Sequence, residues 1–303
     1  MSKWRLPNNL EDLFSNKAKK LELFRRKLID LFADYDYQYI MPSLLEYEDS
    51  LKAYGKDLDI DTFKVVDQSS GRMMGISSDL TTQAARVDAY LLSENNSINK
   101  LCYAGQILKT KAGPGSSREL FQVGLEYFGN AELAADIEIQ TILIKSLMLL
   151  GCEDVTIDVN DLGIYRILTG NLDLLGQERE ELAAAMMLKD KSLVKSILKR
   201  FNNKSDVKKI ISLLDMVGDK SILEKLKNLY GEDNIFVESI KKLEMLSKNI
   251  ESLDSVVTFD FSDIRGYQYH SGIVCNAYAK GFTAPVAQGG RYDNLNEAIG
   301  LKR

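Results

Sequence analysis

The sequence predicts an α+β fold, in which helices interrupt and flank an antiparallel sheet and a helical subdomain is inserted. β-prone runs separated by turn residues fill much of the first half of the chain. From about residue 162 to 249 the chain becomes rich in Leu, Lys and Glu with helical periodicity, and the β-rich pattern returns at VVTFDFS. We therefore expect a first core part over residues 1–161, a helical subdomain over 162–250 and a second core part over 251–303. At 303 residues, one large domain with an insertion and two domains both remain open.

The elements of the first half follow from local patterns. From residue 16, apolar residues recur at helical spacing opposite a basic face, which predicts an amphipathic helix. The run YQYIMPSLLEY is β-prone, and its Pro42 suits a strand start, an edge or a bulge. TFKVVD and RMMGIS around QSSG predict one hairpin, and KLCYAGQILKTK and RELFQVGLEYFG around AGPGSS predict a second with longer strands. Asp79 precedes a helical stripe as an N-cap, residues 132–149 are expected as a helix, and residues 154–159 as a strand.

Composition limits the classes of function. A formal charge of −5 and a pI near 5.2 argue weakly against nucleic acid as the main partner. The start of the chain has neither signal nor transit character and no run approaches a membrane span, so we expect a cytoplasmic chain without a membrane partner. Three widely spaced cysteines without a CxxC pair, together with one histidine, predict reduced thiols and no metal site.

The stretch DIRGYQYHSG, residues 263–272, lies between two apolar runs and is unusually polar for a strand. In an extended segment, Arg265, Tyr267, Tyr269 and Ser271 would share one face, which would offer a cation and three hydroxyl groups. This pattern predicts a pocket wall for a small charged ligand. His270 would fall on the opposite face, where it has no catalytic triad to join, so we expect a packing or surface role for it.

The strand RELFQVGLEYFG supplies the opposite charge. Alternation places Gln122, Gly124 and Glu126 on one face, and the glycine would remove bulk where a ligand could lie. Glu126 paired with Arg265 across one sheet would match the two ends of an amino acid zwitterion. A purely structural Arg–Glu bridge is the alternative interpretation.

With these residues laid out, nearly all of residues 4–300 resembles the class II histidyl-tRNA synthetase core. The resemblance is closer to the paralogous regulatory subunits of short-form ATP phosphoribosyltransferase. It rests on an ordered series of motifs: WRLPNNLEDLF, LLEYEDSL, TFKVVDQSSGRMMGISSDLTTQAAR, RELFQVGLEYFG, RGYQYHSG and GGRYDNL. It implies a class II synthetase-like antiparallel sheet flanked by helices.

The resemblance also implies a histidine pocket, carried over position by position onto seven residues: Asp79, Thr81, Gln122, Glu126, Arg265, Tyr269 and Tyr292. Asp79, Thr81 and Gln122 would bind the α-ammonium group of histidine. Glu126 and a tyrosine hydroxyl would bind the imidazole, and Arg265 the carboxylate region. Lys109, Lys111 and Arg118 are expected either as loop contacts or as a solvated hairpin tip.

Departures from the synthetases favour the regulatory family. Lys109 and Lys111 stand where synthetases carry an Arg-x-Glu that grips ATP, and a lysine cannot form the bidentate fork of an arginine. The loop is one residue shorter, and RGLDYY has become RGYQYH. The chain stops at Arg303, before the motif 3 helix and any anticodon-binding domain, so we expect the C-terminal end of the core to be missing.

The resemblance thus implies a non-catalytic regulatory subunit with no cofactor, no catalytic residues and no tRNA partner. It would form a homodimer within a hetero-oligomer with the short catalytic subunit, and histidine would be its effector. Two alternatives are a truncated synthetase-like enzyme that activates histidine, and a binding module that senses an amino acid without this partner. The first predicts ATP-dependent pyrophosphate exchange, and the second predicts histidine binding without a stable complex.

Overall fold

The structure is a computed structural model that describes residues 5–52, 61–92, 98–112, 117–267 and 269–293. The chain divides into two compact units, one formed by residues 1–131 with 294–303 and the other by residues 132–293. Each unit is described by itself below. The tip of the predicted AGPGSS loop and the end of the chain fall outside the described residues.

The described residues of the first unit form three helices and two three-stranded sheets. Its described elements are α1 (Asn16–Ala33), β1 (Gln38–Ile40), β2 (Leu45–Tyr47), α2 (Glu48–Lys52), β3 (Phe63–Val66), β4 (Met73–Ile76), α4 (Leu80–Leu91), β5 (Asn99–Leu108) and β6 (Glu119–Phe128). One sheet has the order β1-β5-β6 and the other the order β2-β4-β3. Both predicted hairpins are confirmed, because β3 pairs with β4 and β5 with β6, each antiparallel.

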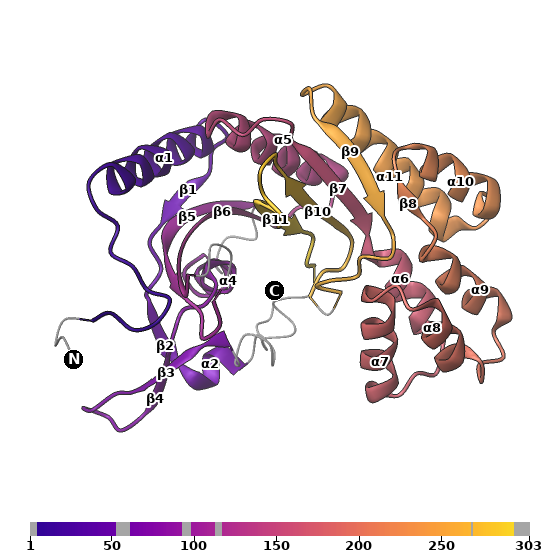
Figure 1. The fold of residues 1–303 in the computed structure, drawn as a ribbon, viewed down its shortest axis with the longest axis horizontal. Coiled ribbons are helices and arrows are strands. Elements are labelled where there is room, and N and C mark those ends of the chain that lie inside the picture. The colour runs from indigo at the N-terminus through magenta and orange to yellow at the C-terminus, as the bar shows by residue number, and fades with distance from the viewer. Residues whose placement is uncertain (1–4, 53–60, 93–97, 113–116, 268, 294–303) are drawn as a thin grey trace. The chain divides into compact units, whose positions relative to one another are not determined.

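The long β5–β6 hairpin organises the first unit (Figure 1). Its register is continuous from Asn99 opposite Phe128 to Leu108 opposite Glu119. Helix α4 packs against both strands, and its buried stripe includes Leu80, Ala84 and Val87. Pro42 lies between β1 and β2, outside both strands, as its missing N–H requires.

The second unit joins one five-stranded sheet to a set of helices. Its described elements are α5 (Leu133–Leu149), β7 (Thr156–Asp161), α6 (Leu162–Gly170), α7 (Gly176–Met187), α8 (Lys191–Leu198), α9 (Lys204–Leu213), β8 (Val217–Gly218), α10 (Ser221–Tyr230), α11 (Asn234–Glu251), β9 (Val256–Asp260), β10 (Ile273–Tyr278) and β11 (Ala287–Gly290). The strand order is β11-β10-β7-β9-β8. The α+β class predicted from the sequence is confirmed. The boundaries predicted for the helical subdomain remain a prediction.

Successive side chains of a strand point to opposite faces of this sheet, and the two faces differ in polarity. Ile157, Val159 and Phe259 point into a core that also receives side chains from α5, α6 and α11, and each is 1% exposed or less. Helix α11 packs against β7, β9 and α5. The intervening positions of the strands carry polar side chains, which face the other way. Strand β7 pairs antiparallel with β10 and parallel with β9, so this sheet is mixed.

The segment DIRGYQYHSG is not a strand, so the prediction of an extended, two-faced segment is wrong. Gly266 has a φ of +76°, and its carbonyl accepts hydrogen bonds from the backbone N–H groups of Tyr269 and His270. These are turn contacts, and they end the alternation of side chains on which the prediction depended. The strand resumes only at β10. Gly289 and Gly290 lie in β11 and pair with β10.

None of the helices within the described residues is both long and apolar enough to span a membrane.

Candidate functional site

The N-terminus of α4 is tied to strand β6 by a set of hydrogen bonds in the first unit. Asp79 is the N-cap, and its Oδ1 accepts from the N–H of Thr81 at 2.8 Å. The same oxygen accepts from Gln122 Nε2 at 3.0 Å. Gln122 Oε1 in turn accepts from the N–H of Leu80 at 2.9 Å. The predicted N-cap is therefore confirmed, and Gln122 locks the helix end to the sheet.

Tyr103, a residue that we did not select from the sequence, connects this helix end to Glu126. Its hydroxyl donates to Glu126 Oε1 at 3.0 Å and lies 3.1 Å from Thr81 Oγ1. Tyr103 is 3% exposed and Glu126 is 7% exposed. Burial, followed by the negative charge of Glu126, raises the pKa of Tyr103 well above its ordinary value. The first unit thus brings Asp79, Thr81, Gln122 and Glu126 into one network.

The interpretation that Gly124 leaves room for a ligand is wrong, because Tyr103 fills that room. Tyr103 lies directly opposite Gly124 in the β5–β6 register. A Cβ atom on Gly124 would lie 2.5 Å from Tyr103 Oη. A tyrosine facing a glycine across a hairpin is the sequence signal that would have identified this residue.

We expect Gly124→Ala to lower the free energy of unfolding by about 1–3 kcal/mol, because the buried Tyr103 ring has to shift to admit a methyl group. Urea unfolding measures the effect. Gly105→Ala in the same hairpin is the matched control, since its Cβ would meet only Leu80 Cδ1 at 3.4 Å. Equal losses for the two variants would contradict this account of Gly124.

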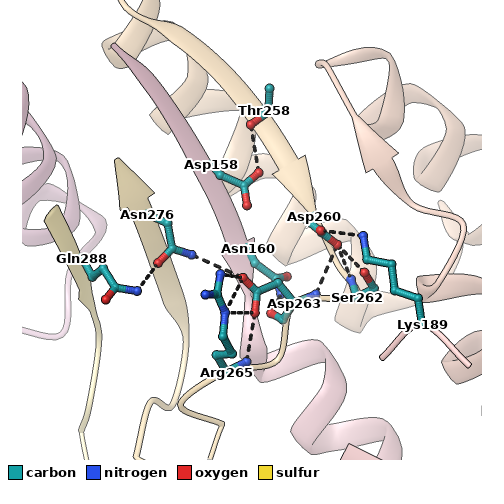
Figure 2. A network of polar contacts seen from close by, with 10 residues as sticks. All are labelled: Asp158, Asn160, Lys189, Thr258, Asp260, Ser262, Asp263, Arg265, Asn276 and Gln288. Carbon is teal, nitrogen blue, oxygen red and sulfur yellow. Dashed lines mark hydrogen bonds and ion pairs between the residues drawn. The ribbon is translucent and has the colours of Figure 1, made fainter. Parts of the chain in front are cut away.

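Arg265 belongs to the second unit and has a different partner from the one predicted. Strand β6 and the turn that carries Arg265 do not share a sheet, and Arg265 forms a bidentate ion pair with Asp263, two residues earlier. Figure 2 shows this pair beside the polar face of the five-stranded sheet. The hydrogen bond with Asp263 raises the pKa of the guanidinium further above its ordinary value, and Tyr278 adds to this shift. The predicted Arg265–Glu126 pairing across one sheet is therefore wrong, because a local carboxylate takes its place.

Tyr269 and Tyr292 are the other predicted residues of the second unit. Tyr269 precedes His270 in the chain, and the Tyr292 ring lies near the His270 ring. Tyr269 is half-buried in the turn that begins at Gly266. The Tyr292 and His270 rings are 6.4 Å apart. Burial lowers the pKa of His270, whose ring lies against two glycines. A Cβ on Gly266 or Gly290 would come within 2.8 Å of that ring, so the expected packing role of His270 is confirmed.

The predicted loop residues stand at the end of the β5–β6 hairpin. Arg118 packs its guanidinium over the Phe63 ring, 4.4 Å from the centroid, and its Nε donates to the Lys109 carbonyl at 3.4 Å. Lys109 is half-buried and Lys111 is exposed. Arg118 therefore contributes to packing in the first unit, and Lys111 is the more accessible cation of the three.

The polar face of the five-stranded sheet contains a carboxyl group with a strongly shifted pKa. Asp158 on β7 accepts a hydrogen bond from Thr258 Oγ1 at 2.9 Å. Burial, which outweighs that hydrogen bond, raises the pKa of Asp158 to about 6, and the charges of Asp260 and Asp263 act in the same direction. Within the described residues, no group of three or more His, Cys, Asp or Glu side chains is placed to hold a metal ion.

We expect Asp158→Asn to raise the free energy of unfolding by about 1–2 kcal/mol at pH 7, allowing for partial solvent screening. The folded chain binds the Asp158 proton more tightly than the unfolded chain. The carboxylate therefore lowers stability as pH rises from about 4 to about 6, and this cost is fully present above that window. Urea unfolding at pH 4 and pH 7 tests this: a gain confined to the higher pH supports it, and an equal gain at both contradicts it.

The comparisons with known proteins define first the class of the protein. The family model described as histidyl-tRNA synthetase matches residues 9–303. A structure from Bacillus halodurans C, described as an ATP phosphoribosyltransferase regulatory subunit/histidyl-tRNA synthetase, is similar with a TM-score of 0.85 and 22% identity. The similarity covers 99% of this chain and 79% of the Bacillus halodurans chain. The fold is thus that of a class II histidyl-tRNA synthetase core.

An ATP phosphoribosyltransferase regulatory subunit from Methylobacillus flagellatus is 40% identical over 305 residues, which covers all of this chain and 78% of the relative. The chain belongs to the ATP phosphoribosyltransferase regulatory subunit family. A structure of an ATP phosphoribosyl transferase complex from Thermotoga maritima is also similar, with a TM-score of 0.66 and 18% identity over 92% of this chain and 93% of that chain.

Proposed function

We propose that this chain is a regulatory subunit of ATP phosphoribosyltransferase, in the first step of histidine biosynthesis, with no catalytic residues of its own. It assembles with the short catalytic subunit, is required for its activity and transmits feedback inhibition by histidine. The family to which the chain belongs supports the regulatory role, and the Thermotoga maritima complex supports a catalytic partner. A homodimer within the hetero-oligomer, and the absence of a tRNA partner, are part of the same proposal.

The hydrogen-bond network that joins Glu126, Tyr103 and the N-terminus of α4 supports the proposal of a histidine site. A carboxylate that is 7% exposed and held by Tyr103 is suited to accept an N–H of an imidazole ring. Asp79 Oδ1 is already saturated by Thr81 and Gln122, whereas Asp79 Oδ2 accepts no hydrogen bond from the residues that the structure describes. That oxygen is available for the ammonium group of an amino acid. Arg265, Tyr269 and Tyr292, in the second unit, remain proposed histidine-binding residues by their resemblance to the family pattern.

Lys109 and Lys111 support the non-catalytic part of the proposal. They follow β5, at the start of the hairpin loop, where a bidentate grip on an ATP phosphate would require an arginine. Regulation then requires a coupling free energy, typically ~1–3 kcal/mol, between the histidine site and the active site of the partner. Histidine must bind the inhibited state of the complex more tightly than the active state.

Reconstitution with the short catalytic subunit tests the proposal. Formation of phosphoribosyl-ATP is measured for the mixture with and without histidine, and for each protein alone. Activity that appears only in the mixture and falls with histidine is the expected result. No stimulation by this chain would reject the regulatory proposal, and ATP-dependent pyrophosphate exchange by this chain alone would support the histidine-activating alternative.

A further inference from the structure

A short segment of the second unit, from the start of α8 into α9, concentrates positive charge. Residues 191–210 contain seven Lys and Arg residues and one acidic residue, Asp206, in a chain whose formal charge is −5. Asp206 is 6% exposed, and its Oδ2 accepts hydrogen bonds from Asn171 and Asn203 at 2.8 Å each. The carboxylate of this segment is therefore engaged inside the unit and does not neutralise the lysines at the surface.

Four lysines of this segment are exposed and form no ion pair with the residues that the structure describes: Lys195, Lys199, Lys204 and Lys208. The first two lie one turn apart at the end of α8, and the last two lie one turn apart at the start of α9. Lys204 Nζ donates to the carbonyl oxygens of Phe201 at 2.9 Å and of Lys199 at 3.5 Å. The two pairs of lysines therefore adjoin where α8 ends and α9 begins, and we call these four residues the lysine patch.

The lysine patch costs the folded chain electrostatic repulsion that no carboxylate of the segment offsets. The other two lysines of the segment are neutralised, since Lys191 pairs with Asp215 and Lys209 with Asp233. A solvated basic surface would account for the patch by itself. It would not account for a cavity lined with amide groups beside the patch.

A polar surface cavity of about 260 Å³ lies between the α6–α7 connection and the α8–α9 connection. Asn171, Asn202, Asn203 and Arg200 are among the side chains that line it. Two of the amides are held in place by their hydrogen bonds to Asp206. The third, that of Asn202, is exposed and forms no hydrogen bond with the residues that the structure describes. The cavity thus combines a fixed amide wall with an amide that is available to a ligand.

We propose that the lysine patch and this cavity bind an extended, acidic segment of a protein partner. An asparagine amide can donate to a backbone carbonyl and accept from a backbone N–H, which suits the main chain of a peptide. Lysines attract carboxylates as point charges. Asp173, an exposed residue, also lines the cavity and would repel a carboxylate there. The cavity therefore takes the main chain, and the lysine patch takes the acidic side chains.

Nucleic acid is the other polyanion that a lysine patch attracts. Proteins that bind single strands stack the bases on accessible aromatic rings. The aromatic ring at this cavity, that of Phe201, is 7% exposed, and the Arg200 guanidinium covers it at 4.4 Å from the centroid. The formal charge of −5 on the whole chain also repels a long polyanion. An acidic peptide therefore fits this surface better than nucleic acid.

Fluorescence anisotropy of three labelled probes with the full chain tests the proposal. The probes are a hexaglutamate peptide, a hexaglutamine peptide and an oligouridine of similar length. We expect hexaglutamate to bind at least about tenfold more tightly than either of the other probes, with an affinity that falls as salt is added. This result is independent of the proposed histidine site.

Variants locate the binding surface. We expect Lys199→Glu combined with Lys208→Glu to weaken hexaglutamate binding at least about tenfold. Lys225→Glu combined with Lys227→Glu is the matched control: these lysines are exposed on α10, the net charge changes equally, and the loss should stay below about threefold. Asn202→Ala leaves the charge unchanged and should weaken binding about threefold through the lost amide contacts. Circular dichroism verifies that each variant is folded.

Four outcomes would contradict the proposal. Absence of hexaglutamate binding to the wild-type chain would overturn it. Equal losses in the two double variants would show general attraction to a charged chain and no defined site. Tighter binding of oligouridine than of hexaglutamate would assign the lysine patch to nucleic acid. Full affinity in Asn202→Ala would overturn the role of the cavity.

Discussion

Arg291→Ala is expected to lower the free energy of unfolding by about 3–5 kcal/mol, the largest stability loss that we predict for this chain. Arg291 Nη2 and Nε donate to the two oxygens of Asp136 on α5 at 2.7 and 3.2 Å, and Nη2 also donates to the Glu132 carbonyl. The two side chains are 15% and 14% exposed. Alanine would leave the carboxylate of Asp136 buried without its cation and would detach the end of β11 from the start of α5.

Urea unfolding of Arg291→Ala, Asp136→Ala and the double variant measures the coupling between the two side chains. The double variant should lose much less than the sum of the single losses, since removing both charges leaves neither of them buried and unpaired. Lys280→Ala is the control, because the Lys280–Asp154 pair is 71% and 72% exposed and should contribute about 0–1 kcal/mol. Strictly additive losses at Arg291 and Asp136 would contradict a coupled pair.

Glu126→Gln is expected to weaken histidine binding by about tenfold to a hundredfold, the largest functional effect that we predict for a single charge. Glutamine has nearly the same shape and can still accept the hydrogen bond from Tyr103. The variant therefore removes the charge that the proposed imidazole contact requires while it keeps the packing. We expect little change in the urea midpoint, because glutamine keeps the volume of the side chain and the hydrogen bond with Tyr103.

Calorimetry with histidine measures the effect of this substitution. Glu119→Gln is the matched control: Glu119 lies on the same strand, and its odd position faces away from Gln122 and Glu126. Full histidine affinity in Glu126→Gln would remove Glu126 from the site. A large loss of stability with unchanged affinity would assign the carboxylate a structural role instead.

Much of the fold was predictable from the sequence because it depends on local patterns. Helix α1 follows from apolar residues at helical spacing, the β5–β6 hairpin from two β-prone runs around a turn, and the start of α4 from the capping residue Asp79. Each signal lies within about twenty residues of the element that it predicts. The ordered motifs also led to the correct family, since a long series of matches is far more specific than any single residue.

The site was only partly predictable, because its contacts join residues far apart in the chain. Tyr103 approaches Gly124 and Glu126 only through the register of the hairpin, and Thr81 only through the docking of α4. For Arg265, period-two alternation was applied to a segment that the positive φ of Gly266 turns out of the extended state. In that turn Arg265 forms an ion pair with Asp263. Assigning alternate side chains to the two faces of a strand could not predict this partner.

The sequence by itself determined most of the secondary structure and the family of this protein, because periodicity, capping and motif order are properties of the chain alone. Only the tertiary structure decided which polar groups pair: Tyr103 with Glu126, Arg265 with Asp263, and Arg291 with Asp136. The physical reason is that a hydrogen bond or ion pair depends on distances of about 3 Å, which strand register and backbone turns set.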